Sequence, residues 1–274
     1  MLKKQTRGNL LLNAPYSLWA AIFIVVPLVI VVYYAFTTSD GAFTFDNLKN
    51  LSNYKDTIRI SIEYSFIATV ITLLIAYPFA YCMTKASENV QRMQMLLVML
   101  PMWMNLLIRT YSWMNILERN GIINNLLSAI GLEPVKFLGT PGAVIFGMIY
   151  NYLPYMILPI YTVMAKIDKS LLDAASDLGC NAVRRVTNVI LPLSMPGVLS
   201  GIAMVFVPSV STFYISQKLG NGKIILIGDT IERFIKTSYN YNMGAALSLV
   251  LMVLILLSMF VVNRFSSEDD DLIV

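Results

Sequence analysis

The sequence predicts an all-α membrane protein with six transmembrane helices. Of its 274 residues, 57% are hydrophobic and only 13% are charged, whereas soluble globular domains are about 45–50% apolar and about 25% charged. Six stretches hold roughly 20 mostly apolar residues each, the length that an α-helix needs to cross a bilayer. The chain contains no histidine, the residue most used as a metal ligand and pH-dependent acid or base. Together these features favour a membrane-embedded protein that carries out no catalysis itself.

The six predicted spans set the domain organisation. The first is too long for the apolar core of a signal peptide and no cleavage motif follows it, so we expect it to be retained. An even number of spans places both termini on one side of the membrane. The spans lie at residues 17–37, 62–83, 93–117, 141–164, 197–216 and 244–262; residues 1–16 form an N-terminal segment, 17–264 the transmembrane domain and 265–274 an acidic tail.

Few features point to catalysis or to a bound cofactor. The two cysteines, Cys82 and Cys180, lack the spacing of zinc ligands, and the chain has no phosphate-binding glycine motif with its lysine. We therefore expect no metal, no nucleotide or other cofactor in this chain, no nucleic-acid partner and no enzymatic activity.

The orientation in the membrane is weakly determined by charge, because lysine and arginine divide evenly between its two sides. The positive-inside rule accordingly gives only a weak preference for cytoplasmic termini, from the basic N-terminus and the turn between the second and third spans.

A charged, alanine-rich segment at residues 171–197 separates the fourth and fifth spans and is longer than a simple connection requires. Asp168 or Ser170 can cap a helix at its start, and Gly179 can end that helix as a glycine with positive φ. The apolar positions of this helix share one face at helical spacing: Leu171, Ala175 and Leu178.

The same segment predicts a second short helix after the glycine. Asn181 can cap it, and we expect it to run to Val189 before Pro192 and Pro196 end the unit and begin the fifth span. Two short helices joined by a glycine form a rigid element suited to docking a partner. The alternative from the residues alone is an amphipathic hairpin that lies on the lipid surface.

The spacing within this segment resembles the conserved loop of ABC importer permeases. The family pattern is Glu-Ala-Ala-x3-Gly-x9-Ile-x-Leu-Pro. This chain resembles it at the same spacing, with Asp173-Ala174-Ala175, Gly179 and Val189-x-Leu191-Pro192, so that Asp replaces Glu and Val replaces Ile. In that family the loop is a coupling helix that docks on a cytoplasmic ATPase subunit. The resemblance implies a type I importer permease with a cytoplasmic loop at residues 165–196, in the cell membrane, with both termini in the cytoplasm. It assigns ATPase coupling to Asp173, Ala174, Ala175, Gly179, Val189, Leu191 and Pro192.

Further segments resemble the polyamine permeases, specifically the first of the two permease subunits for spermidine and putrescine. They include "YPFAYCMTKAS", "LPMWMNLLIRTYSW" and "LIGDTI". Permeases for ferric iron, sulfate and molybdate share the loop and the core, so these cargoes remain alternatives. The resemblance implies a second permease subunit, two ATPase subunits that carry ATP and Mg, an extracytoplasmic substrate-binding protein and surrounding membrane lipid. A secondary transporter remains a third possibility, although no inverted repeat is evident.

Candidates for the substrate path are polar or aromatic residues of the spans. Arg109 is an ionisable residue within a span, with Asn105 and Ser112 expected on its face, and such residues are functional candidates. The alternative is that Arg109 extends to the membrane surface or pairs with Glu63 or Glu118. Aromatic faces attract ammonium groups, although interfacial packing is their usual role, and acids in outward loops attract a polycation. The further candidates are Trp103, Trp113, Tyr150, Tyr152, Tyr155, Tyr214, Asp229 and Glu232.

Overall fold

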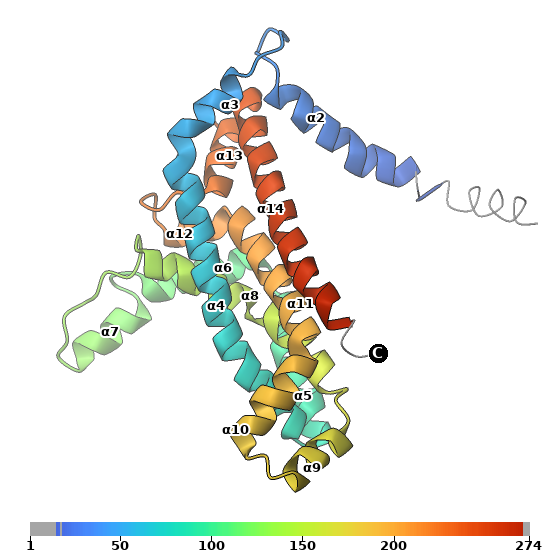
Figure 1. The fold of residues 1–274 in the computed structure, drawn as a ribbon. Helices are drawn as coiled ribbons and strands as arrows, with labels where there is room; N and C mark the ends of the chain where they lie inside the picture. The colour runs from blue at the N-terminus through green and yellow to red at the C-terminus, as the bar shows by residue number, and fades with distance from the viewer. Residues whose placement is uncertain (1–14, 17, 271–274) are drawn as a thin grey trace, which may run out of the picture. The chain divides into compact units, whose positions relative to one another are not determined.

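The computed structural model describes residues 15–16 and 18–270, and these residues form helices and connections without a β-strand. Figure 1 shows the helices in chain order. They are η1 (Ala21–Val25), α2 (Val26–Ala35), α3 (Asp46–Asn50), η2 (Leu51–Tyr54), α4 (Lys55–Lys85), α5 (Glu88–Trp103), α6 (Leu106–Leu117), α7 (Ile122–Ala129), α8 (Pro141–Met164), α9 (Lys169–Asp177), α10 (Ala182–Arg185), η3 (Val186–Ile190), α11 (Leu191–Ser211), α12 (Tyr214–Leu219), α13 (Ile227–Lys236) and α14 (Tyr241–Asp270).

The predicted all-α membrane class is confirmed. Among the described residues, five helical stretches are long and apolar enough to cross a membrane, and a bent helix pair can supply a sixth span. The five are Leu18–Ala35, Asp46–Lys85, Pro141–Met164, Ala182–Ser211 and Tyr241–Val262.

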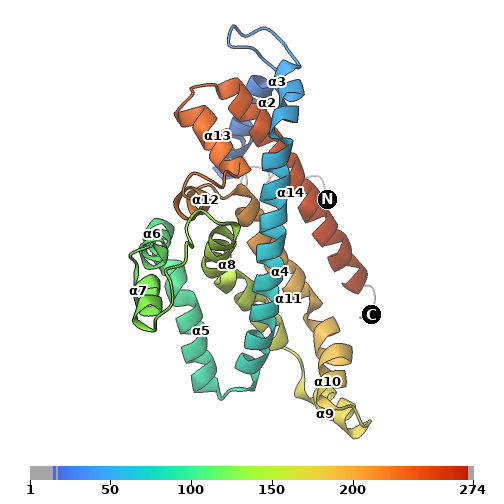
Figure 2. The ribbon, with the colours of Figure 1, turned by 90° about the vertical axis from the view of Figure 1, so that its left-hand side faces the viewer.

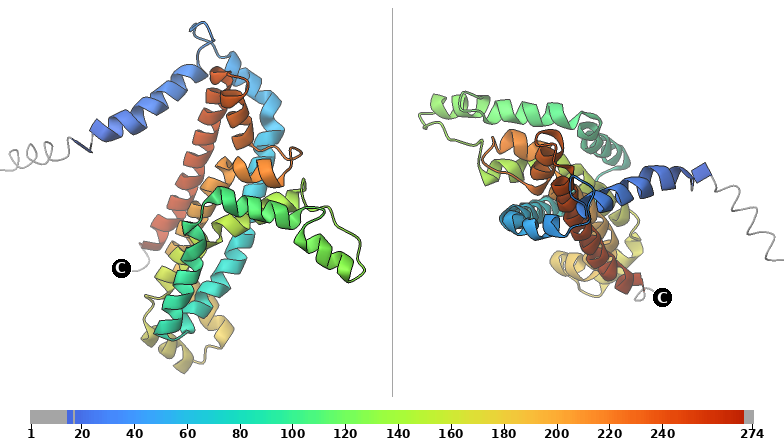
Figure 3. Two further views of the ribbon diagram at one scale, coloured as in Figure 1. Left: turned by 180° about the vertical axis from the view of Figure 1, so that it is seen from behind. Right: turned by 90° about the horizontal axis from the view of Figure 1, so that it is seen from above.

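The third predicted span is not one straight helix. Residues Glu88–Trp103 and Leu106–Ala129 meet at 91°, and Figure 3 shows the sharp turn between α5 and α6. Pro101 lies in the last turn of α5, and the Asn105 side chain accepts a hydrogen bond from the Leu107 backbone N–H at 2.7 Å, which starts a new helix. The expectation of a continuous span at 93–117 was wrong because this capping asparagine was taken as part of a polar face.

The described chain forms two compact units. The first comprises the residues up to Lys55 together with Thr230–Val253. Inside it, Asn242 donates to the carbonyl oxygens of Tyr34 (3.1 Å) and Thr37 (2.6 Å), and Asn47 donates to that of Thr37 (2.9 Å). These side chains satisfy carbonyls that the end of α2 leaves without helical partners.

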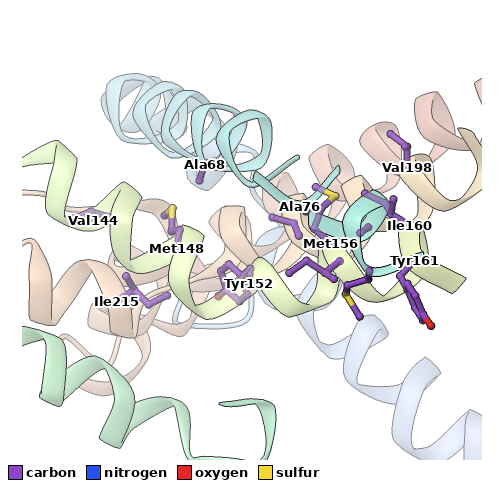
Figure 4. Packing of buried hydrophobic residues seen from close by; sticks show 14 of the residues in the cluster. Ala68, Ala76, Val144, Met148, Tyr152, Met156, Ile160, Tyr161, Val198 and Ile215 are labelled. Atoms are coloured by element: carbon purple, nitrogen blue, oxygen red, sulfur yellow. The ribbon is translucent and has the colours of Figure 1, made fainter. Parts of the chain in front are cut away.

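The second unit comprises Asp56–Asp229 and the chain from Leu254 onward, and α8 is the centre of its core. Met148, Met156 and Ile160 of α8 are fully buried. Figure 4 shows α8 side chains among Ala68 and Ala76 of α4, with Ile215 of α12 and Val198 of α11 nearby. The small residues of α4 allow its backbone to approach α8 closely.

Two glycines on α11 let that helix pack directly on α8. A Cβ atom built on Gly197 would lie 2.8 Å from the carbonyl oxygen of Pro159, and one built on Gly201 would lie 2.7 Å from the sulfur of Met156. Gly197 and Gly201 have the Gly-x-x-x-Gly spacing of close helix pairs in membranes. At Gly197 the nearest atom is backbone, so this position excludes a side chain, whereas at Gly201 the nearest atom belongs to the flexible Met156 side chain.

The ends of the chain are only partly described. Residues 1–14 of the predicted N-terminal segment and residues 271–274 of the predicted acidic tail lie outside the described residues. The described start of that tail, residues 265–270, belongs to α14, which runs from Tyr241 to Asp270. The helix therefore extends past the apolar stretch at 244–262 into the acidic sequence.

Candidate functional site

The candidate docking loop lies at the end of the second unit where α4 turns into α5 (Figures 1 and 2). Its first helix, α9, begins where the Asp168 carboxylate accepts a hydrogen bond from the Ser170 backbone N–H at 2.9 Å. Backbone and side-chain hydrogen bonds from Ser170 hold the pKa of the Asp168 carboxyl below its ordinary value, because they favour its charged form. Asp168 is therefore the cap, and Asp173 is left exposed on the helix surface.

Gly179 ends α9 in the left-handed conformation, with φ +79°. The Gly179 N–H donates to the carbonyl of Ser176 and the Cys180 N–H to that of Ala175, both at 3.0 Å. This pair of bonds is the Schellman arrangement, which requires positive φ at the residue after the helix. A Cβ atom at Gly179 would meet nothing within 4 Å. The predicted positive φ is confirmed, and backbone conformation alone accounts for the glycine.

The second helix does not stop before the fifth span, which corrects the sequence prediction. Asn181 caps α10 by accepting a hydrogen bond from the Arg184 backbone N–H at 2.8 Å, as expected. Residues Ala182–Ser211 then form one continuous helical run, with Pro192 in the first turn of α11. The π-helical turn η3 lies just before this proline and widens the helix where a proline ring would press on the preceding turn.

The apolar face predicted for α9 is mostly open. Of Leu171, Ala175 and Leu178, only Ala175 is buried, and Leu178 is 86% exposed. Asp173, Ala174 and Gly179 are also exposed, whereas Val189 and Leu191 are half-buried at the start of the fifth span, beside the exposed Pro192. The predicted coupling residues therefore divide into those in or just after α9, which are exposed except for Ala175, and those between α10 and α11.

Side-chain hydrogen bonds hold the loop and its base together. Arg185 donates to the Ser176 hydroxyl at 2.8 Å and so ties α10 to α9. Gln91 of α5 donates to the Ala86 carbonyl (2.8 Å) and accepts from the Tyr161 hydroxyl (2.9 Å), which ties the α4–α5 turn to α8. A cavity of about 720 Å³ lies between these parts, with Asp173 and Arg185 in its wall. One bond thus joins the two short helices of the loop, and the others join the α4–α5 turn to α8 on the far side of the cavity.

The residues of the polar face predicted around Arg109 differ in burial. Asn105 precedes α6 as its cap, and Asn105 and Ser112 are exposed, whereas Arg109 is 5% exposed. The three residues keep their helical register in α6, since the Arg109 N–H donates to the Asn105 carbonyl at 3.2 Å, and they differ in burial.

Arg109 neither extends to the surface nor pairs with Glu63 or Glu118. The ion pairs recorded among the described residues join Asp46 to Lys49, Glu88 to Arg92 and Glu232 to Lys236. The Nε and Nη1 atoms of Arg109 are buried and have no hydrogen-bond partner in the described chain. The charge of Arg109 is therefore directed into the protein, close enough to Tyr152 to interact with it electrostatically.

The predicted aromatic candidates separate into three groups and one isolated residue. The Trp113 ring meets Phe146 edge-on at 4.6 Å and Tyr150 at 5.2 Å between centroids. Tyr152 and Tyr155 form a second pair at 6.4 Å, and the Tyr152 hydroxyl donates to the Pro208 carbonyl at 3.3 Å. In the third group, the ring of Tyr214 meets that of Tyr111 at 6.0 Å between centroids. The isolated residue is Trp103, which is exposed at the end of α5.

The two acids predicted in outward loops do not form an open acidic entrance for the cargo. Asp229 is only 8% exposed and accepts a hydrogen bond from the Leu226 backbone N–H at 2.9 Å at the start of α13. Glu232 forms an ion pair with Lys236, one turn further along α13, at 2.8 Å. Helix formation at residues 227–236 explains both results, because it turns one acid inward and places a lysine beside the other.

Sequence reasoning missed Tyr111 and Lys218, which join Tyr214 only through the contact of α6 with α12.

Comparison with known proteins places the chain in one family. Residues 68–267 match the model for "Binding-protein-dependent transport system inner membrane component". The spermidine/putrescine transport system permease protein PotB of Haemophilus influenzae is 40% identical over 256 residues, which cover 90% of each chain. PotB of Escherichia coli K12 is 34% identical over 258 residues, covering 90% of this chain and 94% of the relative.

A solved structure shares the fold. It is the crystal structure of a bacterial ABC transporter involved in the import of the acidic polysaccharide alginate, with a TM-score of 0.75 and 21% identity over 97% of this chain and 98% of the other. The predicted relation to ABC importer permeases is confirmed, and with it a multi-pass membrane protein. The chain belongs to the family of binding-protein-dependent transport system inner membrane components.

Proposed function

We propose that this chain is a permease subunit of an ATP-driven importer of polyamines such as putrescine and spermidine. The observation that carries the proposal is the 40% identity to a spermidine/putrescine permease over 90% of both chains. In the proposed complex the chain works with a second permease subunit, two ATPase subunits and an extracytoplasmic binding protein. ATP and Mg bind to the ATPase subunits, and this chain provides half of the membrane path and one docking loop.

The geometry supports a direct route from the docking loop to the membrane path. Arg185 joins α10 to α9, and the run Ala182–Ser211 is continuous, so a displacement of the loop moves α11 with it. Because α11 contacts α8 through Gly197 and Gly201, the motion passes to the centre of the core. Closure of the ATPases would draw the docked loops together and turn the spans from inward- to outward-facing, a largely rigid-body change.

The cargo is tested by uptake into cells that lack their own polyamine import and express the complete complex. We expect saturable, ATP-dependent uptake of radiolabelled putrescine or spermidine that requires the binding protein. A second part of the experiment replaces the buried Arg109. Arg109→Met keeps the apolar stem, so with a polyamine cargo uptake should fall only through lost packing and the cargo preference should persist.

The competing cargoes give a different pattern. An oxyanion path would use a positive charge directly, so Arg109→Met would largely abolish binding within the membrane. Saturable uptake of sulfate, molybdate or ferric iron without uptake of either polyamine would reject the proposed cargo and leave the family assignment standing.

The orientation of the docking loop is tested with its cysteine. Cys180 follows Gly179 in the proposed loop and is half-buried, whereas Cys82 is exposed on α4. The experiment therefore needs a Cys82→Ala background. Without the ATPase, a membrane-impermeant thiol reagent should label inverted vesicles strongly and right-side-out vesicles weakly. The reverse pattern would place the loop outside the cell and remove it from ATPase coupling.

A further inference from the structure

The side chain of Lys218 lies against two tyrosine rings. Its Nζ atom is 4.9 Å from the ring centroid of Tyr111 and 5.6 Å from that of Tyr214. The two rings meet edge to face at 6.0 Å. Among the described residues, no carboxylate forms an ion pair with Lys218. The ammonium is thus held beside aromatic faces, which attract cations through the negative potential of the ring.

The packing of α12 brings these groups together. A Cβ atom on Gly147 of α8 would lie 2.4 Å from the Leu219 side chain and 2.8 Å from that of Ile215, so the missing side chain lets α12 press against α8. Ile215 and Leu219 are fully buried on that side. Tyr214 and Lys218, four residues apart, share the other side of the helix, where they meet α6.

Tyr111 is contributed by α6 and stays accessible. It is 42% exposed, and Lys218 and Tyr214 are half-buried. The break between α5 and α6 positions Tyr111 opposite α12, so the site depends on the bent span. These residues surround an accessible ammonium position on the unit that contains the proposed path.

The occupant of the site has the chemistry of the proposed cargo. A lysine side chain is four methylene groups that end in a primary ammonium, which is also one end of putrescine. The contacts that hold Lys218 are therefore contacts that a primary alkylammonium can make. The other aromatic groups, around Trp113 and around Tyr152, have no recorded cation over their rings among the described residues.

We infer that Tyr111 and Tyr214 form a binding site for a primary ammonium group of the cargo, and that Lys218 is a tethered occupant which the cargo displaces. The inference rests on the proposed function, since it takes the cargo to be an alkylammonium. While the site holds no cargo, Lys218 fills it and competes with ammonium ions from solution.

The test is putrescine binding by the purified complex of both permeases and both ATPases, without the binding protein, measured by calorimetry. Lys218→Met removes the competing ammonium and keeps most of the apolar stem, so the Kd for putrescine should fall about five- to tenfold. In that background, Tyr111→Leu or Tyr214→Leu should raise the Kd about tenfold. Tyr214→Phe should keep it within about twofold because the ring face remains. Tyr111→Phe should raise it less than Tyr111→Leu, because it keeps the ring and loses the hydroxyl that interacts with the ammonium.

Lys85 provides a matched control. Its Nζ atom lies 4.7 Å from the ring of Tyr81, near the docking loop, in a cation–π contact with one ring. Lys85→Met should leave the Kd unchanged. Gel filtration and thermal melting of each complex report whether the variants assemble.

Three results would overturn the inference: an unchanged or higher Kd in Lys218→Met, no detectable binding by that variant, or equal effects of Lys218→Met and Lys85→Met. If wild-type complex imports radiolabelled putrescine while Lys218→Met shows any of these results, the ammonium site fails and the proposed function stands. Absence of polyamine uptake by the wild-type complex would instead reject the proposed function.

Discussion

Gly197→Val is expected to prevent assembly of a stable transporter. A Cβ atom at this position would lie 2.8 Å from the Pro159 carbonyl oxygen, 3.1 Å from the Ile160 Cα and 3.1 Å from the Val163 Cβ. Two of these atoms are backbone, so no side-chain rotation can relieve the overlap and α11 must move away from α8. Overpacking a tight core costs about 1–3 kcal/mol and sometimes more, and the branched side chain adds further overlap.

The measurement is the yield of assembled complex and its thermal unfolding midpoint in detergent. Gly142, in the first turn of α8, is the matched control, because the nearest atom to a Cβ there is 4.0 Å away. Gly142→Ala should be neutral or slightly stabilising, since alanine favours helix over glycine by about 1 kcal/mol. Gly197→Ala should lower the midpoint. Equal midpoints for the two alanine variants would show that α8 and α11 do not pack closely in the membrane.

Gly179→Val is expected to abolish ATP-driven uptake while the chain still inserts in the membrane. The residue has φ +79° and open space around it, so the effect comes from the backbone. The left-handed conformation costs an L-residue about 1–2 kcal/mol, and β-branched residues tolerate it least. A valine would therefore open the turn, break the two hydrogen bonds after α9 and misdirect the docking surface.

Asparagine supplies the control at the same position, because it adopts positive φ more readily than other side chains. Uptake of radiolabelled cargo and co-purification of the ATPase should both be largely lost in Gly179→Val and largely kept in Gly179→Asn. Normal uptake by Gly179→Val with the ATPase bound would remove this turn from the coupling mechanism. Equal loss in both variants would show that the absence of a side chain matters, and not the backbone conformation.

The sequence predicted features that depend on residues near one another in the chain. The spans follow from runs of apolar residues, and the glycine turn of the docking loop follows from the hydrogen bonds that a helix end must satisfy. Both are local, so composition and spacing suffice. The continuous helix from Ala182 was missed because Pro192 was taken to begin a new helix, whereas a π-helical turn accommodates it.

The candidate substrate path was predicted less well. Asn105 was placed in a continuous span with Arg109, but it caps the new helix that follows a 91° bend and is exposed, whereas Arg109 is buried. Asp229 was expected to face solvent, but its carboxylate accepts the Leu226 N–H in a buried turn. In each case the residue type was informative and its orientation was not, because a capping bond or a bend changes which face is buried.

The sequence by itself determined the helical membrane class, the apolar segments that form the spans, the glycine-linked loop between the fourth and fifth predicted spans, and the resemblance to importer permeases. Only the tertiary structure decided that Gly197 brings α11 against α8, that Arg109 is buried, and that Lys218 lies against the rings of Tyr111 and Tyr214. The physical reason is the range of the interactions. Hydrophobic periodicity and helix capping act over a few residues, whereas a site between helices depends on how closely two distant backbones approach, which packing of the whole unit sets.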